Sequence, residues 1–271
     1  ARRAEELSDT GWVRGRAARR GDSMAAASLL AWATLAALFL VSNLMLAMLG
    51  VAYETSGGAQ WQKIAPATYL AFAALAAFLA AHRNLSALAG ELVRRHKGFL
   101  LFAVTWAMLF AYVAFGHGAA LTSTFDTFLL PMALFVLLPR LPQRTQRVLA
   151  LSLHGFMALN ALIGLAEFAL GWRLTPLVAE GLELTSDYRS SALLGHPLNN
   201  AAMTAAYGII LMLGGGRDLR PGTRGALLLL QTLALAVFGG RFAAVLFLAA
   251  AAGIGGWNAL GYGPGGGCGH G

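Results

Sequence analysis

The 271-residue chain is too apolar for a soluble domain, because 58% of its residues are hydrophobic and only 12% are charged, whereas about a quarter are charged in ordinary soluble proteins. The formal net charge of +8 comes from Lys and Arg in short segments between long apolar runs, so it does not indicate a nucleic-acid-binding protein. A single cysteine, Cys268, excludes an internal disulfide framework and a thiolate metal site. The composition predicts an all-α, polytopic transmembrane helix bundle.

Eight apolar stretches come close to the length, about 20 residues, that a helix needs to cross a bilayer. In chain order they are 25–50, 64–81, 98–116, 120–138, 148–170, 199–214, 225–239 and 241–257. The sixth is short, and only Gly239 and Gly240 separate the last two. The first is longer than the roughly 7–15 apolar residues of a signal peptide, so we expect it to remain as a membrane anchor.

These spans divide the chain into three parts. Residues 1–23 form a polar tail, residues 24–257 the transmembrane domain, and residues 258–271 a Gly-rich tail that we expect to be disordered. Cys268 and His270 in this last tail are too few for a zinc site, which needs three or four protein ligands.

The positions of Lys and Arg predict the orientation, because these residues are enriched in cytoplasmic segments. With a cytoplasmic N-terminus and alternating spans, all but four of the 20 Lys and Arg residues lie inside. The four outside are Lys63, Arg173, Arg189 and Arg241. We therefore expect the N-terminus to be cytoplasmic and the segment 171–198 to be the longest outer loop.

Two of the outer arginines are candidates for binding an anion. Arg189 lies in the 171–198 loop, and Arg241 begins the last span. Guanidinium suits phosphate because its fork of donors matches two oxygens and keeps its charge. The pair could clamp a pyrophosphate at the membrane surface. The simpler alternative is that each side chain extends to lipid headgroups.

The residues after Arg189 add polar groups near the same interface. Pro197 disfavours helix at His196, and Asn199 or Asn200 can cap the span that follows, whose N-terminus favours an anion. The alternative is an ordinary capped loop in which His196 only forms hydrogen bonds. Glu167, near the outer end of the fifth span, could orient an arginine, bind a sugar hydroxyl, or lie as a carboxylate among the headgroups.

Three stretches resemble one family, that of the O-antigen ligase and O-antigen polymerase-like membrane proteins, in particular its exopolysaccharide-cluster branch. Arg-Ser-Ser-Ala-Leu-Leu-Gly-His-Pro-Leu-Asn-Asn-Ala at 189–201 is similar to the central signature of the family. Gly-Gly-Arg-Phe-Ala-Ala at 239–244 is similar to its second Arg motif, and Leu-Asn-Ala-Leu-Ile-Gly-Leu-Ala-Glu at 159–167 to the span before the outer loop. The resemblance covers about 120–250.

The resemblance implies glycan transfer or polymerisation at the periplasmic face of a bacterial inner membrane. The donor would be a glycan on undecaprenyl pyrophosphate, and the reaction would invert the anomeric centre without a metal or other cofactor. Arg189 and Arg241 would act as catalytic residues that hold the pyrophosphate. His196, Asn199, Asn200 and Glu167 would contact the substrate. Other polysaccharide-assembly proteins would be further partners, besides the lipid bilayer.

The chain also departs from the family. The family continues with a large periplasmic loop whose His acts as general base, and this sequence stops before it, so we expect a C-terminally truncated form. Two alternatives to the enzyme therefore stay open. One is a polysaccharide transporter or flippase, which would need paired charges deep in its spans. The other is a non-catalytic truncated membrane partner.

Overall fold

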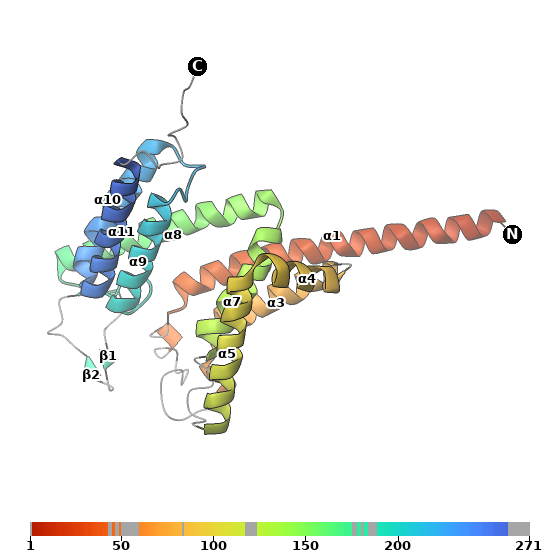
Figure 1. The fold of residues 1–271 in the computed structure, drawn as a ribbon, viewed down its shortest axis with the longest axis horizontal. Coiled ribbons are helices and arrows are strands. Elements are labelled where there is room, and N and C mark those ends of the chain that lie inside the picture. The colour runs from red at the N-terminus through yellow and green to blue at the C-terminus, as the bar shows by residue number, and fades with distance from the viewer. Residues whose placement is uncertain are drawn as a thin grey trace, which may run out of the picture. The chain divides into compact units, whose positions relative to one another are not determined.

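The structure is a computed structural model that describes residues 2–42, 45–46, 49, 60–82, 84–116, 124–174, 178–179, 182–183 and 189–259. The Gly-rich tail from 260 onward, with Cys268 and His270, lies outside these residues. The described part is built almost entirely of helices, as the sequence predicts (Figure 1). The chain divides into two compact units, residues 1–149 and 150–271.

The first unit includes the residues of the first four predicted spans, from 25–50 to 120–138. Its elements are α1 (Arg2–Leu40), η1 (Gln60–Lys63), α3 (Pro66–Ala81), α4 (Leu85–Arg95), α5 (Lys97–Gly116), the π-helical turn η2 (Phe125–Leu129), α7 (Leu130–Leu137) and η3 (Leu138–Arg140). Helix α3 packs along α1 and against α7. Small residues such as Ala27, Ala31 and Ala74 are buried with Phe78 and Leu137 in the core between these helices.

Local chemistry explains where this unit departs from the predicted spans. Helix α1 ends at Leu40 rather than at 50, because the Ser42 hydroxyl accepts a hydrogen bond from the Met45 amide (3.2 Å) and starts a new turn. The described part of the predicted 120–138 span begins at Thr124 and passes through η2 directly into α7. Pro131 follows this turn, and a proline removes a helical hydrogen bond and displaces the carbonyl four residues earlier.

The basic segment 82–97, which we expected to be a loop, contains the helix α4. Asn84 caps it by accepting a hydrogen bond from the Ala87 amide at 3.0 Å. Leu88 is buried, while Arg94 and Arg95 are exposed in the last turn. Helices α3 and α4 form a sharply bent pair at this point, which is either a broken span or a re-entrant segment.

The second unit carries the candidate site. Helix α8 (Gln143–Leu170) enters it from the first unit, and it continues with the short hairpin β1 (Val178–Ala179) and β2 (Leu182–Glu183), then α9 (Pro197–Met212), α10 (Pro221–Phe238) and α11 (Arg241–Ala259). Helix α9 packs against both α10 and α11, and the three lie side by side (Figure 1). Helix α10 ends at Gly239, which adopts a left-handed conformation with φ +66°.

Several helices are long and apolar enough to cross a membrane. By length and composition there are four in the described residues, or five if the bent α3–α4 pair counts as one span. They are Gly21–Leu40 within α1, and the helices α5, α8 and α10. The chain is thus a helical protein with the composition of a membrane protein.

Candidate functional site

One face of α8 holds the segment that carries Arg189. Asn160, Gly164 and Glu167 recur at helical spacing on this face, and each accepts a hydrogen bond from the segment 190–193. Ser190 Oγ donates to the Gly164 carbonyl at 2.6 Å, and the Leu193 amide donates to Asn160 Oδ1 at 3.0 Å. The stretches 159–167 and 189–201 are therefore in direct contact.

The carboxylate of Glu167 is the centre of this contact. It is 4% exposed, and it accepts hydrogen bonds from the amides of Leu174 (2.7 Å), Ser191 (2.9 Å) and Ala192 (2.9 Å). Because residues at both ends of the 171–198 loop donate to one buried carboxylate, Glu167 closes the loop. The burial contradicts the alternative of a carboxylate among lipid headgroups. Its assignment to sugar binding stays a prediction.

The turn between Arg189 and α9 is held in an unusual conformation. Ala192 is fully buried and has a positive φ of 39°, which is uncommon for a residue other than Gly. Gly195, with φ 71°, supplies the second left-handed residue. The hydrogen bonds of Glu167 and Asn160 fix this backbone, which sets where Arg189 lies relative to α9.

His196, rather than Asn199 or Asn200, caps α9. Its Nδ1 accepts a hydrogen bond from the Leu198 amide at 3.2 Å. Pro197 then occupies the first helical position, where its missing N–H costs nothing, so the cap must precede it. The prediction of an Asn cap is wrong for this reason.

Asn199 and Asn200, which the sequence grouped together, have different surroundings. Asn199 is exposed on the first turn of α9. Asn200 is fully buried, and its Nδ2 donates to the carbonyls of Ser191 and His196, the latter at 3.0 Å. Asn200 therefore stabilises the turn. Of the four residues predicted to contact the substrate, His196 and Asn199 are exposed.

The structure also brings Arg189 to the motif that contains Arg241. The Ser190 amide donates to the Val237 carbonyl at 3.3 Å. The Cδ atom of Arg189 lies 2.7 Å from the position that a Cβ on Gly239 would occupy. Arg241, two residues later, is the first residue of α11 and is exposed. The two arginines that the sequence singled out thus lie at the same corner of the second unit.

Close packing at two glycines joins α8, α9 and the junction of α10 and α11 at this corner. A Cβ on Gly240 would lie 2.3 Å from the Ala201 Cβ, and a Cβ on Gly164 would lie 2.5 Å from the Phe238 ring. Ala161, Ala192, Ala201 and Phe238 are buried together in the same apolar cluster. The N-termini of α9 and α11 therefore approach each other, and both ends carry partial positive charge.

Sequence reasoning missed several buried polar residues of this unit. Asn160, Thr204 and Gln231 are at most 1% exposed, and each has one polar atom without a hydrogen-bond partner among the described residues, as does Asn200 at Oδ1. Gln231 also donates to the Met157 carbonyl at 3.1 Å. Asn200 and Thr204 are four residues apart on α9, a spacing that could have identified a polar stripe on an otherwise apolar helix.

The geometry makes the corner suited to an anion. The stem of Arg189, the first residue of α11, Arg241, and the N-termini of α9 and α11 lie at this corner, and the one acidic side chain on the α8 face, Glu167, accepts hydrogen bonds from three amides. No protein-family model, curated protein or solved structure matches the chain. Within the described residues, no three His, Cys, Asp or Glu side chains are grouped as a metal site would require. The loop residues 175–177, 180–181 and 184–188 lie outside those described.

Proposed function

We propose that the protein transfers or polymerises glycans from an undecaprenyl-pyrophosphate-linked donor at the periplasmic face of a bacterial inner membrane. The observation that carries the proposal is the contact of Arg189 with Gly239, which brings it to the motif of Arg241. The two guanidinium groups would bind the pyrophosphate and stabilise the charge that it acquires as the glycosidic bond breaks. The transfer would invert the anomeric centre and use no metal.

The proposal includes eight spans and a cytoplasmic N-terminus. Alternating spans place the two partners of the following long-range polar contacts on the same side of the membrane, which supports the alternation, while the cytoplasmic N-terminus rests on the distribution of Lys and Arg. The contacts on the proposed outer side join Asp126 to Ala65 and Ser190 to Val237. Those on the inner side join Arg140 to Glu91, Thr145 to Ser28 and Arg224 to Met212.

Arginine variants test the proposal in a deletion strain complemented with the full chain. We expect Arg189→Ala and Arg241→Ala each to abolish long surface polysaccharide while the amount of membrane-inserted protein is unchanged. Arg189→Lys and Arg241→Lys should retain only part of the activity, because Lys keeps the charge but not the two-pronged geometry. Arg173→Ala, which removes another proposed outer arginine, is the matched control and should behave as the wild type.

The position of the unused donor distinguishes the alternatives. Lipid-linked glycan should accumulate on the outer leaflet in the Ala variants, because transfer is blocked after translocation. Accumulation on the inner leaflet would instead indicate a flippase. Polysaccharide of normal length in both variants would exclude a role for this corner in transfer.

A further inference from the structure

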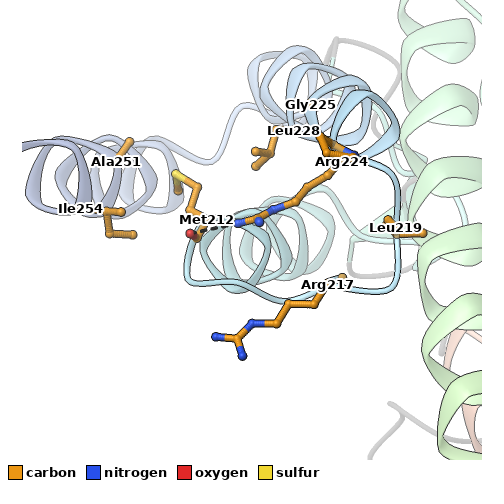
Figure 2. A pocket seen from close by; sticks show the side chains of 10 residues that line it. Met212, Arg217, Leu219, Arg224, Gly225, Leu228, Ala251 and Ile254 are labelled. Carbon is orange, nitrogen blue, oxygen red and sulfur yellow. Dashed lines mark hydrogen bonds between the residues drawn. The ribbon is translucent and has the colours of Figure 1, made fainter. Parts of the chain in front are cut away.

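A pocket of about 630 Å³ lies at the opposite end of α9 from the candidate site. It is formed where α9 ends, α10 begins and the last turns of α11 pass (Figure 2). Its volume is within the range of roughly 300–1,000 Å³ that is typical of ligand sites. The side chains that define its chemistry are Met212, Arg217, Arg224, Leu228, Ala251 and Ile254.

One arginine of the pocket is held in place by the end of α9. Arg224 Nη2 donates to the Leu211 carbonyl and, at 3.2 Å, to the Met212 carbonyl, as the dashed line in Figure 2 shows for Met212. Both carbonyls belong to the last turn of α9, and that of Leu211 also accepts a hydrogen bond from the Gly214 amide at 3.3 Å. The guanidinium is therefore fixed in orientation, and its remaining N–H groups can bind an acceptor in the pocket.

The other sides of the pocket are of two kinds, one charged and one apolar. Arg217, from the turn between α9 and α10, is exposed. Leu228 of α10 and Ala251 and Ile254 of α11 form an apolar side (Figure 2). The turn between α9 and α10 together with the first four residues of α10, 213–224, contains three arginines, Arg217, Arg220 and Arg224, but only one acidic residue, Asp218. The pocket thus combines a cationic edge with an apolar wall.

We propose that this pocket binds the headgroup and first acyl carbons of an acidic phospholipid. In the proposed topology the basic turn links the ends of α9 and α10 and would lie at the depth of the phosphate groups in a bilayer. Arg217 and Arg224 bind the phosphate, and Leu228, Ala251 and Ile254 contact the chains. A free anion would gain nothing from the apolar wall, and a neutral lipid would gain little from the arginines. The site is separate from the proposed glycan chemistry and does not depend on it.

Native mass spectrometry of the full chain tests this proposal. The purified, delipidated protein is mixed with phosphatidylglycerol or phosphatidylcholine of the same acyl chains. We expect one retained phosphatidylglycerol per chain and about tenfold weaker retention of phosphatidylcholine, since each basic residue near a lipid surface favours an acidic headgroup. Arg217→Gln should lower phosphatidylglycerol retention about fivefold, and Leu228→Trp, which fills the pocket, should lower it at least as much.

The matched control is Arg220→Gln, because Arg220 is exposed on the same turn but does not line the pocket. We expect it to retain phosphatidylglycerol as the wild type does. An equal loss in Arg220→Gln and Arg217→Gln would show only general attraction to the basic turn and would overturn the proposal. Equal retention of both lipids, or displacement of phosphatidylglycerol by inorganic phosphate, would overturn it as well, the latter by indicating a free-anion site.

Discussion

The side-chain stem of Arg189 lies directly against the backbone of Gly239, so that no side chain can be added to Gly239 without moving Arg189. A Cβ at this position would lie 2.7 Å from the Arg189 Cδ and 2.9 Å from its Cγ. Gly239 also has a left-handed φ of +66°, which other residues adopt only with strain. The glycine thus serves both as the end of α10 and as the surface on which Arg189 lies.

We expect Gly239→Ala to displace Arg189 and to destabilise the second unit by at least about 1–2 kcal/mol, the cost of a left-handed conformation with a side chain. Thermal unfolding in detergent measures the stability, and the surface polysaccharide of a complemented strain measures the activity. Gly155→Ala is the control, because Gly155 lies in α8 with nothing within 4 Å of its added Cβ. It should be neutral or stabilising. Equal stability of the two variants would contradict the role of Gly239.

Glu167→Gln should destabilise the outer loop, because the amide offers one acceptor oxygen and turns its NH₂ group toward backbone N–H donors. Three charge-assisted hydrogen bonds are weakened in a buried site, and we expect a loss of about 2–4 kcal/mol in the free energy of unfolding. Proteolysis of the 171–198 loop in the purified protein gives an independent measurement. Glu91→Gln is the control, since its contact with Arg140 is a partly exposed ion pair at 3.6 Å and should change stability by less than about 0.5 kcal/mol. A stable loop in Glu167→Gln would refute the anchoring role.

Hydropathy predicted the bounds of two helices closely, because each begins or ends at a residue that differs chemically from the apolar residues of the span. The predicted 64–81 and 98–116 stretches correspond to the helices Pro66–Ala81 and Lys97–Gly116. The 225–239 stretch in fact begins at Pro221, and the preference of Pro for the first helical turn could have located this start. Hydropathy could not predict the π-helical turn before α7, because a π-turn depends on how the neighbouring helices pack around Pro131.

The sequence could predict which residues belong to the candidate site, but not the contacts between them. The sequence identified Arg189, Arg241, His196 and Glu167 from their charge and their place between spans. It could not show that Glu167 binds the loop backbone, because that contact joins residues 24 positions apart through a turn with a strained Ala192. The proximity of Arg189 to Gly239 depends on the packing of α8, α9 and α10, which a single sequence does not encode in any local pattern.

Asp126→Ala should destabilise the first unit. The Asp126 carboxylate accepts hydrogen bonds from the Ala65 amide at 3.0 and 3.1 Å and from Thr68 Oγ1 at 2.6 Å, so it caps α3 from another segment. We expect a loss of about 1–2 kcal/mol, measured by thermal unfolding. Asp22→Ala, at an exposed position of α1, should leave the unfolding temperature unchanged, and an equal effect of both would argue against the cap.

Cysteine labelling decides on which side of the membrane the arginine corner lies. In a Cys268→Ser parent, single cysteines replace Trp172 and Arg220, both exposed and located at opposite ends of the second unit's helices. We expect a membrane-impermeant maleimide to label Trp172→Cys in intact spheroplasts and Arg220→Cys only after permeabilisation. This result follows from the excess of Lys and Arg in the proposed inner loops. The reverse pattern would place Arg189 and Arg241 in the cytoplasm and exclude transfer at the periplasmic face.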